Sequence, residues 1–306
     1  MSEPASTMTA PDIEDVPATT LDATRCHLGE GANYDSGSDT AWWFDILQRR
    51  LFEAKLDTGR TTSHALPVMA SALAFIDDTH QLLAGDDGLY IRDINDGRLA
   101  LHTAIEDDNA VTRSNDARAH PCGTFWTSTM GRKAETGAGA IYALHEGVLT
   151  RLYANVTIPN AICFAPDGAT GYFADTHKNV LHRVALDPAT GLPTGTPETL
   201  YVHRGEGGLD GAVVDRDGLI WCARWGGGCV DAYSPDGVRL RTLRVPARQP
   251  SCPVFIGAGF DRMLVTSAHQ GMDDAARAAD PEHGRTFLMN PGARGRPEPR
   301  VTLGTS

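Results

Sequence analysis

The stretch DRDGLIWCARWG at residues 215–226 carries the pattern on which the fold prediction depends. A turn signal of Asp and Gly precedes a short run of apolar and aromatic residues centred on Trp221. Asp-Gly pairs favour tight turns, and short runs rich in aromatic and β-branched residues favour strands. The stretch therefore predicts a strand that follows a tight turn.

This pattern occurs six times along the chain. One residue anchors each run: Trp43, Leu83, Trp126, Tyr172, Trp221 and Leu264. The intervals between successive anchors are 40, 43, 46, 49 and 43 residues, which is the period expected of propeller blades. A β-sandwich also contains many short strands, but it does not explain a steady interval. We therefore predict an all-β fold, a six-bladed β-propeller.

The repeats leave no linker between them, so we expect a single domain over residues 21–306 and a disordered N-terminal tail over 1–20. The tail is acidic and lacks the features of a secretory signal. A propeller ring must close, and we predict that a strand near 21–28 pairs with one near 298–303, because an unpaired edge invites aggregation. Helical sequence is confined to 273–280, where we expect one short helical turn.

Composition narrows the class of partner. The 306-residue chain has a formal net charge of −12, which makes a nucleic-acid backbone an unfavourable partner. It has no apolar run of about 18 residues, so we expect no membrane span. Its six cysteines form no C-x-x-C pair, and we expect free buried thiols in a reducing cytoplasm. The predicted assembly is a monomer or a weak homo-oligomer.

Counting backward from the anchors places polar residues at one shared repeat position. They are Glu30, Asn115, Asn160 and Asp210, which precede their anchors by 13, 11, 12 and 11 residues. A single Asp or Asn beside Gly is ordinarily a turn residue; the shared position distinguishes these four, because the inner strand of each blade lines the central channel. Carboxylate and amide oxygens there are costly to bury unless a cation neutralises them.

The oxygen donors predict one divalent metal ion, which could be Ca, Zn, Mn, Mg or Fe. We expect Glu30, Asn160 and Asp210 to be its ligands. Three protein ligands leave positions open for water and substrate, which is the arrangement of a catalytic site.

At these residues the sequence resembles the gluconolactonase/regucalcin family of six-bladed propellers. The matching stretches are LGEGANYD (28–35) with WWFDI (42–46), RSNDARAHPCGTFWTSTMG (113–131), IPNAICFAPDGATGYFADT (158–176) and LDGAVVDRDGLIWCARWGGG (209–228). The resemblance implies the same three metal ligands. It also implies substrate contacts from Arg113 and Asn115. The sequence has Lys133 where animal members carry a substrate-contacting Glu, so Lys133 is expected at the substrate and their sugar preference does not transfer.

The stretch WGGG at 225–228 resembles bacterial sugar lactonases that act on aldonolactones. The resemblance therefore implies metal-dependent hydrolysis of a sugar lactone, with the metal as Lewis acid on the lactone carbonyl. Asp210 is the expected general base, while Arg113 and Asn115 hold ring hydroxyls. Two alternatives stay open: a metal-dependent phosphotriesterase or esterase on the same scaffold, and a non-catalytic calcium-binding protein.

Overall fold

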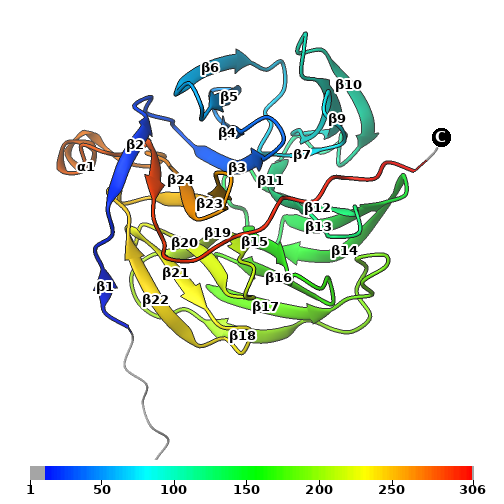
Figure 1. Cartoon of the computed structure of the whole chain (residues 1–306). Coiled ribbons are helices and arrows are strands. Elements are labelled where there is room, and N and C mark those ends of the chain that lie inside the picture. The colour runs from blue at the N-terminus through cyan, green and yellow to red at the C-terminus, as the bar shows by residue number, and fades with distance from the viewer. Residues whose placement is uncertain (1–10, 305–306) are drawn as a thin grey trace, which may run out of the picture.

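Six small sheets stand around a central axis in the computed structural model, which describes residues 11–304 (Figure 1). The first sheet contains β3 (Gly29–Asp35), β4 (Thr40–Asp45), β5 (Arg50–Lys55) and β6 (Arg60–Ala65). The second contains β7 (Ala72–Phe75), β8 (His80–Ala84), β9 (Gly88–Asp93) and β10 (Leu99–Ala104). The third contains β11 (Thr112–Ala119), β12 (Phe125–Gly131), β13 (Gly139–His145) and β14 (Val148–Val156).

The remaining three sheets continue the ring. The fourth contains β15 (Pro159–Phe164), β16 (Thr170–Asp175), β17 (Val180–Ala185) and β18 (Glu198–Val202). The fifth contains β19 (Gly208–Val214), β20 (Ile220–Trp225), β21 (Cys229–Tyr233) and β22 (Arg239–Arg244), with β1 (Ile13–Glu14) added parallel to β22. The sixth contains β23 (Pro250–Ile256), β24 (Arg262–Ser267), β25 (Thr286–Met289) and β2 (Ala18–Asp22). The predicted six-bladed β-propeller is confirmed.

The first strand of each blade is the innermost one. These strands are β3, β7, β11, β15, β19 and β23; each contacts the next, and β23 contacts β3, so the ring is closed. Each anchor residue lies on the second strand of its blade and is buried. Trp126, for example, meets Phe164 of the next blade edge to face, with ring centroids 5.3 Å apart. Fully burying such a side chain contributes about 1.5–3 kcal/mol, so the anchors hold neighbouring blades together.

The predicted pairing of strands that closes the ring is wrong. In the sixth blade β2 pairs with β25, with Ala18 opposite Met289, and the segment 298–303 forms no strand. Two prolines, Pro297 and Pro299, flank the start of that segment and cannot donate to a β-ladder. The segment instead crosses one face of the ring (Figure 1), where the Val301 N–H donates to the Phe75 carbonyl at 2.8 Å.

The N-terminal segment differs from the predicted tail. The predicted tail covers residues 1–20, yet residues 11–20 include β1 and the start of β2, because Glu14 pairs with Arg241 and β2 completes the sixth blade. Residues 1–10 lie outside the described residues.

The short helix is confirmed as α1 (Asp274–Ala279), capped by the Asp273 side chain. All six cysteines are free and five are buried. Within residues 11–304 no helix has the length and apolar character needed to cross a membrane.

Candidate functional site

The inner strands carry irregularities at the residues singled out from the sequence. In β3 the pairing with β4 shifts between Glu30 and Asn33, and in β15 the pairing with β16 shifts between Asn160 and Cys163. In β19 the shift follows Leu209, so Asp210 lies inside it. β-Bulges re-aim side chains and are over-represented next to active sites.

The backbone beside two of these residues is left-handed. Gly31 has φ +60°, and a Cβ there would lie 2.1 Å from the Ser71 carbonyl oxygen, so only glycine fits. Ala161, which follows Asn160, has φ 55° despite its side chain. A non-glycine residue in this region costs about 1–3 kcal/mol, and such residues cluster at functional sites.

All six predicted site residues line one cavity of about 340 Å³. They are Glu30, Arg113, Asn115, Lys133, Asn160 and Asp210. Five of them, all but Lys133, lie in the first half of their inner strands, so the cavity opens at the end of the channel opposite the C-terminal segment. The structure therefore brings together residues that are up to 180 positions apart in the sequence.

A chain of hydrogen bonds fixes the amides on the cavity wall. Arg113 Nη1 donates to Asn115 Oδ1 at 3.0 Å, and Asn115 Nδ2 donates to Asn160 Oδ1 at 3.0 Å. Asn160 Nδ2 donates to Thr176 Oγ1 at 2.8 Å, and that hydroxyl donates to the Leu209 carbonyl at 2.6 Å. Because a carbonyl oxygen has two lone pairs, Asn160 Oδ1 keeps one for a further donor or a cation.

In the described part of the chain, the two carboxylates on the cavity wall, Glu30 and Asp210, are not held by side-chain hydrogen bonds as the amides are. Within residues 11–304 no side chain donates a hydrogen bond to the carboxylate oxygens of Glu30 or Asp210; the Cys222 thiol donates only to the main-chain carbonyl of Asp210, at 3.4 Å. Burial and repulsion from Asp116 raise the pKa of Glu30 to about 8. Burial, together with repulsion from Glu30 and Asp116, raises the pKa of Asp210. The Arg113 guanidinium lowers both pKa values, but it does not offset burial and repulsion. A cation at the same place would stabilise the charged form of both carboxylates.

Asp116 is a site residue that the sequence reasoning missed. It follows Asn115 on β11, its Oδ2 accepts from the Ile162 N–H at 2.7 Å, and burial raises its pKa to about 6. It contributes to the raised pKa values of both Glu30 and Asp210. The only signal in the sequence is its place in RSND, directly after Asn115.

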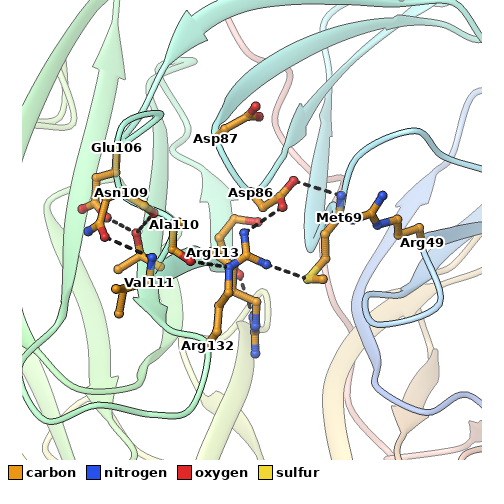
Figure 2. Close-up of polar contacts among 12 residues, drawn as sticks. Arg49, Met69, Asp86, Asp87, Glu106, Asn109, Ala110, Val111, Arg113 and Arg132 are labelled. Carbon is orange, nitrogen blue, oxygen red and sulfur yellow. Dashed lines mark hydrogen bonds and ion pairs between the residues drawn. The ribbon is translucent and has the colours of Figure 1, made fainter.

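Arg132 is a second missed residue, at the rim of the cavity. Figure 2 shows its guanidinium between three segments: Nη2 donates to Asp86 Oδ2 at 2.9 Å, Nε to the Ala110 carbonyl at 3.1 Å, and Nη1 to Met69 Sδ at 3.7 Å. These contacts neutralise the charge of Arg132 and fix the start of the turn that carries Lys133. Trp225 and Gln270 also line the cavity without having been predicted.

The donor set fits a hard divalent ion. Among the described residues no three His, Cys, Asp or Glu side chains gather as a metal site; the predicted set instead combines two carboxylates with one amide. Oxygen donors of this kind suit Ca²⁺, Mg²⁺ or Mn²⁺. Two carboxylates balance the charge of such an ion. Glu30, Asn160 and Asp210 are therefore the residues that could hold a metal in this cavity.

Comparison with known proteins agrees with this architecture. Residues 28–269 match the model of the SMP-30/Gluconolactonase/LRE-like region. A Rhizobium meliloti protein named "Putative sugar lactone lactonase" is 53% identical over 95% of this chain and 99% of its own length. The L-arabinolactonase of Azospirillum brasilense is 33% identical over 89% of this chain and 91% of its own.

Among solved structures, a calcium-binding protein from Agrobacterium tumefaciens, regucalcin, superposes with a TM-score of 0.93. It is 51% identical, and the match covers 96% of this chain and all of that one. The closed ring of six blades, the residues gathered in its channel and these matches together place the chain in the SMP-30/gluconolactonase/LRE-like family.

Proposed function

We propose that this protein hydrolyses a five- or six-carbon sugar lactone to the aldonic acid, with one divalent metal ion held by Glu30, Asn160 and Asp210. The observation that carries the proposal is the convergence of these three side chains with Arg113 and Asn115 on one cavity of about 340 Å³. This volume lies near the lower end of the range for small-molecule sites, which is about 300–1,000 Å³. The named activities of the relatives support the same reaction.

The chemistry of each residue suggests its role in the reaction. When bound, the ion supplies positive charge beside the lactone carbonyl. Asp210 accepts a proton from the attacking water, because its carboxylate lines the same cavity as the predicted substrate contacts Arg113 and Asn115. Arg113 presents a planar guanidinium to substrate hydroxyls. Lys133, at the rim, contacts the outer part of the substrate.

A lactone panel tests the proposal. Metal-free protein is loaded with Ca²⁺, Mn²⁺, Mg²⁺ or Zn²⁺ and assayed by proton release on five- and six-carbon aldonolactones. We expect turnover with at least one ion and none after chelation. Asp210→Asn should lose turnover, and metal binding measured by calorimetry reports separately on its role as ligand. Full activity of the chelated protein, or of Asp210→Asn, would contradict the proposal.

The alternatives from the sequence become outcomes of the same panel. Hydrolysis of an organophosphate in preference to every lactone would identify a phosphotriesterase. Calcium binding without any turnover would identify a binding protein, as the name of the Agrobacterium tumefaciens protein suggests for that relative. A cytoplasmic location and a monomeric or weakly oligomeric state stay predictions.

A further inference from the structure

A second and larger cavity, which we call the outer groove, adjoins the cavity with the predicted metal ligands. Its volume is about 810 Å³, and it lies between the turn Gly226–Gly228 and helix α1. Trp225 and Gln270 line both cavities, so the two meet at these side chains. A substrate whose lactone ring lies over Asp210 therefore has room to extend past Trp225 into the outer groove.

On the Trp225 side the wall includes three consecutive glycines, Gly226–Gly228. Gly226 and Gly228 have φ +75° and +63°, which glycine adopts without strain. A Cβ at Gly227 would lie 2.7 Å from the Arg224 side chain. The partly exposed Trp225 is thus followed by three residues without side chains, which leaves their backbone partly exposed beside the aromatic residue.

Two of the charged side chains that line the outer groove are already paired. Arg244 Nε lies 2.6 Å from Asp15 Oδ1, and Glu282 Oε2 lies 2.7 Å from Arg285 Nη1. A charged ligand would have to compete with these partners. Neither pair therefore supplies a free charge to the outer groove.

The other charged groups also leave little net charge. The Asp280 carboxylate accepts from the Arg248 N–H at 2.8 Å and from the Glu282 N–H at 3.2 Å. The remaining two charges, Glu206 and the Arg248 guanidinium, are of opposite sign. By contrast, the Trp225 indole N–H and the Gln270 side-chain amide make no hydrogen bond within residues 11–304, so neutral donors and acceptors are what the outer groove offers a ligand.

We propose that the outer groove is a second sugar subsite, and that the preferred substrate is the lactone of an aldonic acid that carries a glycosyl substituent. A pyranose ring has apolar C–H faces and a hydroxyl edge, which match an indole face beside neutral hydrogen-bonding groups. This inference rests on the proposed function. In the reaction, water adds to the lactone carbonyl carbon and the ring C–O bond breaks. The products are the glycosylated aldonate and one proton, and the glycosidic bond stays intact.

The test compares gluconolactone with disaccharide-derived lactones. Cellobionolactone and maltobionolactone carry the second sugar at O4, and melibionolactone carries it at O6. For the metal-loaded wild type we expect kcat/KM on at least one of them to exceed that on gluconolactone by about tenfold, equivalent to about 1.4 kcal/mol. A γ-lactone with an alkyl chain is included as a substrate of similar length without hydroxyls.

Two matched variants on α1 locate the effect. Ala279 lines the outer groove but not the smaller cavity, whereas the neighbouring exposed Ala278 lines neither. Ala279→Trp should remove the advantage of the disaccharide lactones and leave gluconolactone turnover unchanged, and Ala278→Trp should retain both. Thermal unfolding of each variant verifies that the fold is intact.

The outcomes separate this inference from the function on which it rests. If no lactone of any kind is hydrolysed, the proposed function fails. If gluconolactone is turned over as well as every disaccharide lactone, or if the two tryptophan variants behave alike, the second subsite is refuted and the lactonase proposal survives. A preference for the alkyl lactone would assign the outer groove to an apolar substituent and overturn the sugar subsite.

Discussion

Asn115 and Asn160 are joined across two blades, because Asn115 Nδ2 donates to Asn160 Oδ1 at 3.0 Å. The Asn160 amide nitrogen is occupied by Thr176 Oγ1 at 2.8 Å, so the two contacts together fix which side of the amide carries the oxygen. A metal ligand held by such outer contacts binds its ion more tightly than a freely rotating one. The position of Asn115 thus makes it an orienting group for Asn160 as well as a candidate substrate contact.

The first prediction follows from this contact. Asn115→Ala should weaken divalent-metal binding by about 10–100-fold, the range for loss of a partner that orients a ligand. Isothermal titration of the metal-free protein with Mn²⁺ or Ca²⁺ measures the change. Asn95→Ala, on an exposed turn of the second blade, is the matched control. Equal affinity of Asn115→Ala and the wild type would show that Asn160 is oriented without its neighbour.

The second prediction concerns the buried carboxylates of the channel. Glu30→Gln should raise the stability of the metal-free protein by about 1 kcal/mol, or roughly 2 °C in Tm, because it removes a carboxylate whose charged form is disfavoured by burial and by repulsion from Asp116. The same variant should lose the stabilisation that added metal gives the wild type. Thermal unfolding with and without the ion measures both effects. The exposed Glu146→Gln should show neither, and a metal-free Glu30→Gln less stable than wild type would contradict the account.

The third prediction concerns the opposite end of the channel. Arg118 Nη1 lies 2.7 Å from Glu298 Oε1, and the two side chains are only 8% and 9% exposed. Glu298→Ala leaves a buried guanidinium short of its partner and should cost about 3–5 kcal/mol in the free energy of unfolding. Urea unfolding measures this cost.

A second glutamate provides the control for this ion pair. Glu198 pairs with Arg183 at 3.3 Å on the surface, where the side chains are 68% and 43% exposed. Glu198→Ala should change stability by less than about 1 kcal/mol. Similar losses from Glu298→Ala and Glu198→Ala would show that the C-terminal segment is not anchored by its ion pair.

The fourth prediction is a pH dependence of stability that arises from His120. Its ring is buried, and burial lowers its pKa from the usual value of 6.5. The neutral ring donates from Nε2 to the Gly168 carbonyl at 2.9 Å and accepts at Nδ1 from the Cys122 N–H at 3.1 Å. Below pH 6.5 the unfolded chain binds a proton that the folded chain does not, so stability falls with falling pH and is fully present above that value.

Urea unfolding between pH 7.5 and 5 checks this sign. His120→Asn should be less stable than wild type at pH 7.5, and the difference should shrink toward pH 5. The exposed His102→Asn should follow the wild type at each pH. A difference that is constant across the range would mean that His120 does not titrate on unfolding.

The sequence by itself determined the repeat and therefore the architecture. Trp43, Trp126 and Trp221 recur at blade spacing because each second strand must bury one large side chain between neighbours, and alternation and turn chemistry are local properties that a sequence displays directly. The shared repeat position also identified Glu30, Asn160 and Asp210 as channel residues, since residues at one position of a repeat occupy equivalent places in a ring.

Only the tertiary structure decided which segments meet. The strand that completes the sixth blade is β2 beside β25 rather than 298–303, because the choice depends on which backbone edges remain free after all the blades have packed. Arg132 carries no local signal that distinguishes it from other turn residues. Asp116 and Trp225 stand in the stretches RSND and WGGG, but their places at the cavities arise from segments brought together over long sequence distances. The positions of strands and turns follow from neighbouring residues in the sequence. The closure of the ring and the shape of its cavities depend on contacts between distant residues, which no local pattern predicts.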